Sequence, residues 1–261
     1  MKPRVAIIGG GWTGCAAGFS LAEAGVPVTL FEASNTLGGR ARRVLFNDIS
    51  LDNGQHLLLG AYQHTMELIA KVWPDSQDTL LRKPLELEQP PDFFLSCPRL
   101  PAPFHLLAGL LCARGLGVSD KLAAARWMRA LLREPPAEDI SVATLIATQP
   151  RRVRATLWEP LCVAALNTPI AHASAKTFIA ILQKVFAQSR ANSDLLFPRC
   201  DLTQLFPQPA ADRMLDMGAE VHTQTRITHL APSNTGFTLS TLTESYEYDR
   251  VIVAVAPQHL A

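Results

Sequence analysis

The sequence is poor in cysteine and in unbalanced charge, and each scarcity excludes a class of protein. Its five cysteines are scattered along 261 residues and never form a C-x-x-C pair. This pattern argues against a disulfide framework or a zinc site and is typical of reduced thiols in a cytoplasmic protein. The formal net charge is only +1, which gives no support for nucleic acid as a partner.

Long apolar runs are also missing, so no transmembrane helix is expected. The most apolar later stretch, FHLLAGLLCA at 104–113, is stopped by Arg114 and is too short to span a bilayer. Two interpretations of it stay open: a helix buried in a substrate domain, which we favour, or a helix that faces a membrane or admits a long substrate. The N-terminal apolar run is short and broken by glycines, so it fits a strand before a turn better than a signal peptide.

The N-terminal part of the chain has the pattern of a βαβ unit. RVAIIGG is a nearly continuous apolar run that ends in glycines, as in a buried parallel strand. A small-residue segment, CAAGFSLAEAG, follows as a helix closed by Gly25. PVTLFEAS then reads as a second buried strand. Together these elements predict an α/β fold.

Later changes in composition predict two domains. A proline-rich stretch after a helical stripe at 62–73 reads as short strands with a hairpin. The chain from 104 to about 190 is predicted to be helical, with N-caps at Ser119, Ser141 and Ser174. We therefore expect a Rossmann-like domain formed by 1–82 and 196–261, and an inserted, mostly helical substrate domain at 83–195.

A G-x-G-x-x-G motif runs from Gly9 to Gly14, between the first predicted strand and helix. This is the context in which the motif binds a dinucleotide. Gly9 allows a tight turn, Gly11 lets a pyrophosphate approach the backbone, and Gly14 lets the helix pack closely on the sheet. The helix N-terminus offers free N–H groups to the phosphates. The alternative is a glycine-rich turn without a ligand.

Two later features point to the same dinucleotide. Glu32 ends the second strand 18 residues after Gly14, where a carboxylate accepts hydrogen bonds from an adenosine ribose and disfavours the 2′-phosphate of NADP. Gly38-Gly39-Arg40 adds a second backbone loop and a guanidinium that suits pyrophosphate. This loop favours a flavin over a nicotinamide dinucleotide, although a solvated glutamate and an ordinary turn remain the alternatives.

The stretch VAIIGGGWTGCAAGFSLAEAGVPVTLFEASNTLGGRARR resembles the N-terminal signature of the flavin amine oxidase and phytoene desaturase superfamily. The resemblance implies an FAD-dependent oxidoreductase in which Glu32 binds ribose and Thr13 and Arg40 lie at the pyrophosphate. Trp12 is expected to pack beside the cofactor. The predicted cofactor-binding residues are Gly9, Gly11, Trp12, Thr13, Gly14, Glu32, Ala33, Gly38, Gly39, Arg40, Gly54, Gln55, His56 and Ile227.

A narrower resemblance, to the hydroxysqualene dehydroxylase family, comes from LDNGQHLLLGAY, WEPLCVAALNTPIAHASAKTF and LLFPRCDLTQLFPQPAADRMLDMGAEV. It implies that Gly54, Gln55 and His56 lie near the flavin ring and that Ile227 meets the adenine through its backbone. It also implies an apolar isoprenoid substrate, hydroxysqualene, which is reduced to squalene in hopanoid synthesis. The sequence does not identify the electron donor, for which NADPH is a candidate. Peripheral contact with the inner membrane face would suit such a substrate.

His56 is the candidate catalytic residue. An imidazole titrates near neutrality and could donate a proton to a departing hydroxyl. The preceding Asn53-Gly54 pair is also typical of a hairpin turn, so His56 could instead hydrogen-bond backbone in a turn. The other histidines are isolated and fit no metal-ligand spacing, and no metal is predicted.

The chain ends at VAVAPQHLA, before the segment that completes the FAD domain in this superfamily. We therefore expect a piece of a longer protein or a truncated product. Two other functions stay open: a flavin desaturase or amine oxidase acting on another apolar substrate, and a non-catalytic chain that needs a partner to complete the FAD site. A nicotinamide dehydrogenase ranks third, because the Gly38-Gly39-Arg40 loop argues against it.

Overall fold

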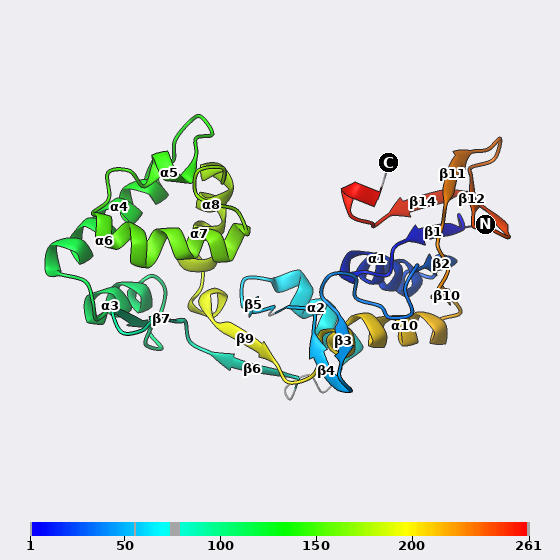
Figure 1. Cartoon of the computed structure of the whole chain (residues 1–261), viewed down its shortest axis with the longest axis horizontal. Helices are drawn as coiled ribbons and strands as arrows, with labels where there is room; N and C mark the ends of the chain where they lie inside the picture. Colours follow the sequence, from blue (N-terminus) through cyan, green and yellow to red (C-terminus); the bar gives the residue numbers. More distant parts are fainter. Residues whose placement is uncertain (1, 55, 74–78, 260–261) are drawn as a thin grey trace. The chain divides into compact units, whose positions relative to one another are not determined.

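The structure is a computed structural model that describes residues 2–54, 56–73 and 79–259. The chain forms two compact units, each made of segments that are separate in the sequence (Figure 1). The first unit contains Met1–Leu57, His64–Leu81 and Phe197–Ala261, and the second contains Leu58–Gln63 and Arg82–Leu196. Across the described residues, no helix has both the length and the apolar character needed to cross a membrane.

A four-stranded parallel sheet forms the centre of the first unit. Its strands are β1 (Val5–Ile8), β2 (Val28–Phe31), β10 (Glu220–His222) and β14 (Arg250–Val253), in the order β10-β2-β1-β14. Every neighbouring pair is parallel. Helix α1 (Trp12–Glu23) connects β1 to β2, so the predicted βαβ unit and the α/β fold are confirmed.

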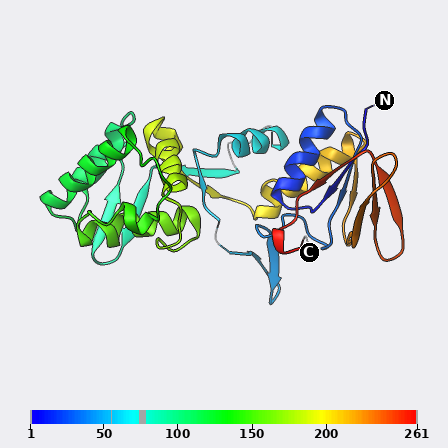
Figure 2. The same ribbon diagram turned by 90° about the horizontal axis from the view of Figure 1, so that it is seen from above.

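Each face of this sheet is covered by a different layer (Figure 2). Helices α1 and α10 lie on one face, and a three-stranded antiparallel sheet of order β11-β12-β13 lies on the other. The bounds of these elements are α10 (Pro207–Asp216), β11 (His229–Pro232), β12 (Phe237–Ser240) and β13 (Ser245–Tyr248). Side chains alternate along β1: Ile7 meets Gly18 of α1, whereas Ala6 packs with Leu239 of β12. The candidate functional site, described below, lies at the carboxyl ends of β1 and β2.

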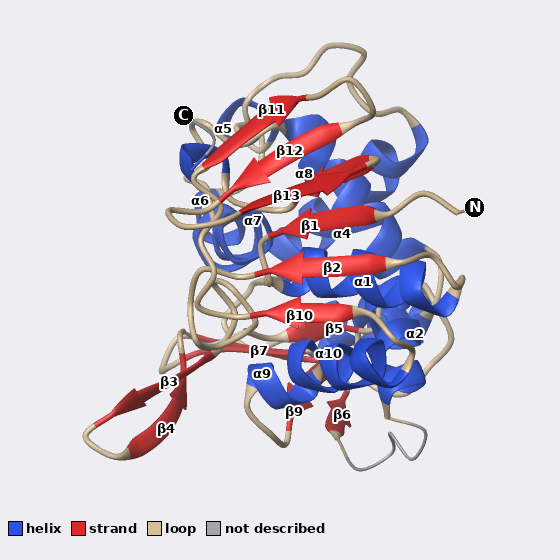
Figure 3. Ribbon diagram, turned by 90° about the vertical axis from the view of Figure 1, so that its right-hand side faces the viewer, coloured by secondary structure: helices blue, strands red, loops and turns tan. Residues whose placement is uncertain are grey.

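The remaining elements of the first unit include a hairpin that corrects the sequence interpretation (Figure 3). They are β3 (Arg43–Phe46), β4 (Ile49–Asp52), α2 (Gln63–Val72), α9 (Leu202–Leu205) and η5 (Pro257–His259). The turn between β3 and β4 is Asn47-Asp48, with φ values of 49° and 62°. Two consecutive positive φ values match the twist of a hairpin, and Asn and Asp tolerate them well. Asn53-Gly54 is therefore not the hairpin tip, because it follows β4.

The second unit is mostly helical. Its helices are α3 (Phe104–Cys112), α4 (Val118–Arg133), α5 (Val142–Leu145), α6 (Arg151–Val153), η2 (Arg154–Trp158), α7 (Glu159–Leu166), α8 (Ala175–Leu182), η3 (Gln183–Ala187) and η4 (Arg190–Ser193). Its strands are β5 (Leu58–Leu59), β6 (Leu80–Lys83) and β9 (Leu195–Pro198), in the order β5-β9-β6, and the hairpin β7 (Glu86–Gln89) and β8 (Phe93–Ser96). The chain passes from one unit to the other within β6 and β9, and also just before β5 and at the start of α2.

Two of the three predicted helix caps are present in the second unit. The hydroxyl oxygens of Ser141 and Ser174 accept hydrogen bonds from the N–H groups three residues later, at 3.1 Å in both cases. The predicted cap at Ser119 is wrong, since α4 starts at Val118 after Gly117. The Asp120 carboxylate accepts a hydrogen bond from the Gly117 N–H at 3.2 Å, which moves the start of the helix towards the N-terminus.

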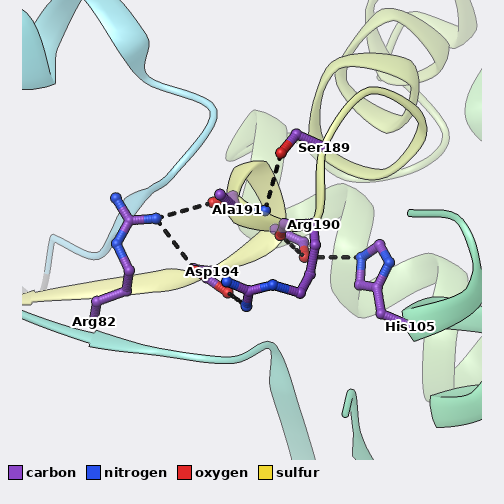
Figure 4. Close-up of polar contacts among 7 residues, drawn as sticks. Arg82, His105, Ser189, Arg190, Ala191 and Asp194 are labelled. Carbon is purple, nitrogen blue, oxygen red and sulfur yellow. Dashed lines mark hydrogen bonds and ion pairs between the residues drawn. The ribbon is translucent and has the colours of Figure 1, made fainter. Parts of the chain in front are cut away.

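A buried carboxylate joins β6, η4 and β9 (Figure 4). Asp194 is only 2% exposed and accepts hydrogen bonds from Arg82 at 3.2 Å and from Arg190 at 2.7 Å. On the other side of η4, the fully buried His105 of α3 places its Nε2 atom 3.1 Å from the Ser193 hydroxyl. The Ser193 hydroxyl in turn donates to the Arg190 carbonyl at 2.8 Å. These contacts fix the conformation of η4 from both sides.

We expect His105 to make the stability of the protein depend on pH. Burial, and secondly the nearby Arg190 guanidinium, lower the pKa of His105 below its ordinary value of 6.5. The unfolded chain therefore binds a proton in a pH range where the folded chain does not, and stability falls as the pH drops below about 6.5. In urea titrations at several pH values, His105→Gln should remove part of this fall, whereas His64→Gln at an exposed site should not. Equal pH profiles for the wild type and His105→Gln would contradict this expectation.

Candidate functional site

The turn after β1 requires glycine at two positions before any ligand is considered. Gly9 has a φ of +108°, and its N–H donates to the Phe31 carbonyl at 2.8 Å. A Cβ atom on Gly14 would lie 1.8 Å from the Gly9 carbonyl oxygen. Only glycine therefore allows α1 to begin this close to the turn.

Gly11 differs from these two, because the protein leaves space beside it. Its φ of −72° suits any residue, and within the described part of the chain an added Cβ would meet only Gly39 Cα, at 3.8 Å. No side chain caps the N-terminus of α1, so the N–H groups of Trp12, Thr13 and Gly14 have no acceptor within the helix. The exposed Thr13 lies at this end, where free donors and the helix dipole attract an anion.

Glu32 follows β2 directly and connects the turn to the next loop. One carboxylate oxygen accepts from the Gly10 N–H and the other from the Ser34 N–H, both at 2.7 Å. A carboxylate has about four acceptor positions, so two remain for hydroxyl groups of a ligand. Ala33, beside it, is exposed.

Cys15 packs behind the turn and is chemically inert. Burial, and secondly the Glu32 carboxylate, raise the pKa of the Cys15 thiol to about 12. Its sulfur lies 3.4 Å from the Gly10 carbonyl oxygen. A thiol with this pKa stays protonated at neutral pH, so Cys15 supports the turn and does not act as a nucleophile.

The second glycine loop lies against the first. The Gly38 N–H donates to the Gly10 carbonyl at 2.8 Å, and a Cβ on Gly39 would lie 3.1 Å from Gly11 Cα. Both glycines have positive φ values, +113° and +62°. The structure thus brings together the two motifs that the sequence predicted to share one ligand. Arg40, which follows them, has an exposed side chain.

Trp12 and Thr203 both hold the second loop in place. The Trp12 indole N–H donates to the Ala41 carbonyl at 2.9 Å, and its ring centroid lies 5.4 Å from that of Phe206. The Thr203 hydroxyl donates to the Leu37 carbonyl at 3.1 Å and accepts from the Arg43 N–H at 2.9 Å. Thr203 is 2% exposed, so one buried hydroxyl secures both ends of the loop.

The stretch after β4 is open to a ligand. Gly54 has a φ of +93°, and among the described residues a Cβ there would meet only the His56 Nε2 atom, at 3.8 Å. His56 is exposed, and its Nε2 lies 3.3 Å from the Asn53 carbonyl oxygen. This contact is the backbone interaction of a turn, and it leaves the imidazole accessible. Gln55, also predicted near the flavin ring, lies outside the described residues.

Ile227 is placed close to Glu32 by backbone contacts just before it. The Gln224 N–H donates to the Ser34 carbonyl at 2.9 Å, and the Thr225 N–H donates to the Glu32 carbonyl at 2.8 Å. Ile227 packs against the cluster formed by Ala6, Phe31, Leu239 and Tyr248. The segment 224–227 therefore runs beside the backbone of Glu32, the residue that is predicted to hold ribose.

These features fit a flavin dinucleotide. Free N–H groups at α1 and the open space at Gly11 suit a pyrophosphate, and Glu32 retains acceptor positions for ribose. The exposed Arg40 directly follows Gly38-Gly39 in the second loop. In the part of the chain that the structure describes, no cluster of three or more potential metal ligands occurs.

Comparison with known protein families matches residues 13–261 to the family described as flavin containing amine oxidoreductase. The chain belongs to this family. The hydroxysqualene dehydroxylase of Zymomonas mobilis is 26% identical over 236 residues, which cover 85% of this chain and 53% of that protein. A second hydroxysqualene dehydroxylase, from Sinorhizobium fredii, is 35% identical over 78 residues, or 29% of this chain and 19% of that protein.

Solved structures support the same fold. An oxidoreductase from Methanosarcina mazei superposes with a TM-score of 0.73 at 16% identity, over 96% of this chain and 58% of that chain. Putrescine oxidase bound to putrescine gives 0.64 at 18% identity, over 98% and 59%. The family match confirms the predicted superfamily and its flavin cofactor, and the solved structures support the fold. The chain spans about half the length of the Zymomonas relative.

Sequence reasoning missed Thr203 and Asp52 as supports of the site. The Asp52 carboxylate accepts from the Leu202 N–H at 2.8 Å, next to the residue whose hydroxyl secures the second loop. Both contacts join segments about 150 residues apart. The one local signal was Asp201, which caps α9 by accepting from the Gln204 N–H at 3.0 Å.

We expect Thr203→Val to lower the free energy of unfolding by about 2 kcal/mol, because it leaves the buried Leu37 carbonyl and the partly buried Arg43 N–H without their partner. FAD affinity should fall roughly tenfold, since a shift of the loop disturbs the contacts that it makes. Thr203→Ser keeps the hydroxyl and is the matched control. Urea unfolding and flavin fluorescence titration measure the two effects, and equal losses in both variants would argue against a role for the hydroxyl.

Proposed function

We propose that this chain carries the FAD-binding and substrate-binding parts of an enzyme that reduces hydroxysqualene to squalene. The observation that supports the proposal is the length of the similarity to the Zymomonas hydroxysqualene dehydroxylase, which covers 85% of the chain. Matches to a protoporphyrinogen oxidase and a polyamine oxidase cover only 22% and 30%. NADPH as electron donor and a cytoplasmic location belong to the same proposal.

The chemistry replaces a carbon–hydroxyl bond by a carbon–hydrogen bond. The substrate gains a hydride and the departing hydroxyl gains a proton, so the products are squalene and water. Reduced FAD, when bound, supplies the hydride equivalent. The protein holds the pyrophosphate at α1 and the two glycine loops, and holds the ribose at Glu32. The apolar side chains of the second unit suit an isoprenoid better than a polar amine.

His56 is the residue that we propose as proton donor. Its imidazole is exposed and follows Gly54, where the backbone is open to a ligand. If His56 protonates the departing hydroxyl, His56→Gln should lower kcat about 100-fold, with little change in FAD affinity. His64→Gln, at an exposed site on α2, is the matched control. A His56→Gln protein with wild-type kcat would remove His56 from the mechanism.

The decisive experiment incubates the FAD-loaded chain with hydroxysqualene and a reductant, without oxygen, and measures squalene by mass spectrometry. Squalene formation supports the proposal. Absence of squalene, together with oxidation of another apolar substrate, would favour the desaturase or amine oxidase alternative. The visible spectrum of the purified chain separates a third case: a colourless protein that does not bind added FAD would be a non-catalytic piece or subunit.

A further inference from the structure

Helix α3 presents apolar side chains to solvent along one face. Phe104, Leu107 and Leu111 are 59%, 46% and 54% exposed, and their spacing places them on one side of the helix. His105 and Gly109, on the other side, are buried. The favoured interpretation of this stretch as a buried helix is therefore correct for one face only.

The exposed apolar surface continues into α4. Val118 and Leu122 are 75% and 43% exposed, and the ammonium group of Lys121 bonds to the Leu111 carbonyl at 2.7 Å. This bond joins the end of α3 to the first turn of α4. We call the surface formed by Phe104, Leu107, Leu111, Val118 and Leu122 the α3–α4 apolar face.

The same segment carries a strong excess of positive charge. Residues 99–133 contain one acidic side chain, Asp120, whereas the whole chain has a net charge of only +1. Asp120 is engaged as an acceptor at the start of α4. The basic side chains of the segment are Arg99, Arg114, Lys121, Arg126, Arg129 and Arg133.

Helix α4 carries both properties on one face. From Val118 and Leu122 the same helical stripe continues through Arg126, Arg129 and Arg133, all exposed. Exposed apolar side chains close to exposed arginines suit a helix that lies on an anionic bilayer, with the apolar groups at the boundary with the acyl chains and the cations at the headgroups. A second copy of the chain fits less well, because its arginine row would meet another of the same sign.

We propose that the α3–α4 apolar face and the arginines of α4 dock the protein on an anionic membrane surface. The inference depends on the second unit alone and goes beyond the proposed reaction. It gives a location to the peripheral membrane contact that the sequence suggested. Anionic phospholipid is the partner, since uncharged lipid would leave the arginine row without counter-charges.

Sedimentation with phosphatidylglycerol-containing vesicles and with pure phosphatidylcholine vesicles tests the proposal on the full chain. Wild type should bind the anionic vesicles and lose binding in high salt. Val118→Glu should reduce binding at least fivefold. This change adds an acidic residue in the first turn of α4, which favours the helix, so unfolding does not explain a loss. Arg126→Gln with Arg129→Gln should reduce binding roughly tenfold or more, at about 1 kcal/mol for each charge.

Leu242→Glu is the matched control, because Leu242 is 91% exposed in the turn between β12 and β13. It should bind vesicles as the wild type does. The proposal is overturned if the wild type ignores both vesicle types, or if Leu242→Glu loses as much binding as Val118→Glu. It is also overturned if the wild type binds neutral vesicles as well as it binds anionic ones. A wild type that binds no vesicles but forms a dimer, which Val118→Glu abolishes, would overturn it too. The proposed reaction is tested separately by squalene formation.

Discussion

Gly14→Ala is expected to destabilise the protein by about 3 kcal/mol or more and to abolish FAD retention. The added Cβ would lie 1.8 Å from the Gly9 carbonyl oxygen and 3.1 Å from the Gly9 carbonyl carbon. The turn cannot easily move aside, because the Gly9 N–H is bonded to β2 through the Phe31 carbonyl. Helix α1 must then shift away from the sheet, which displaces its N-terminal N–H groups from the cofactor site.

The measurement is urea unfolding followed by circular dichroism, together with the flavin absorbance of the purified protein. Gly117→Ala is the matched control: Gly117 also precedes a helix, and its nearest neighbour to an added Cβ is an Asp120 carboxylate oxygen at 3.6 Å. Its cost should stay near 1 kcal/mol or less. Equal midpoints for Gly14→Ala and the wild type would contradict the packing described for α1.

Gly11→Ala is expected to separate binding from folding. Its added Cβ would meet only Gly39 Cα at 3.8 Å, and the φ of −72° is ordinary for alanine. The free energy of unfolding of the FAD-free protein should therefore change by less than about 1 kcal/mol. The methyl group occupies the space that a pyrophosphate needs, so two or three charge-assisted hydrogen bonds weaken together. FAD affinity should fall about 1000-fold.

Titration of FAD-free protein with FAD, followed by flavin fluorescence, gives the affinity, and urea unfolding without FAD gives the stability. Gly117→Ala again serves as control, because it removes a glycine before a helix, α4, that is not part of the predicted FAD site. If Gly11→Ala binds FAD as tightly as the wild type does, the pyrophosphate does not lie over the start of α1. A large loss of stability in the FAD-free protein would instead mean that the space beside Gly11 is filled by the chain.

Local sequence patterns predicted the strands and the helix around the two glycine loops, because each of these elements is determined by residues that are close in the sequence. Apolar runs ending in glycine identified β1, and the acidic residue after the second run identified the end of β2. The close approach of Gly38 to Gly10 was expected from their shared ligand. Thr203 could not be predicted, because nothing near residue 203 indicates that its hydroxyl contacts residues 37 and 43.

The position of the hairpin turn and the burial of α3 differ from the sequence-based expectation for the same reason: both depend on contacts with other segments of the chain. Asn53-Gly54 is the stronger hairpin sequence, yet the turn forms at Asn47-Asp48, because strand pairing from Arg43 to Asp52 leaves only two residues unpaired there. For the α3 segment we favoured a buried helix over one that faces a membrane or admits a substrate, whereas the structure buries one face and exposes the other. Composition predicts that a helix forms, but neighbouring elements decide how much of it is covered.

The position of β1 in its sheet has a consequence for synthesis on the ribosome. One edge of β1 pairs with β2, which is made soon afterwards, but the other pairs with β14 at Arg250–Val253. All residues up to Val253 must therefore emerge before this edge is paired. The second unit can acquire its structure during that interval, whereas the nascent first unit exposes an unpaired apolar strand that favours aggregation. A chaperone that shields residues 5–8 during translation should therefore raise the yield of folded protein.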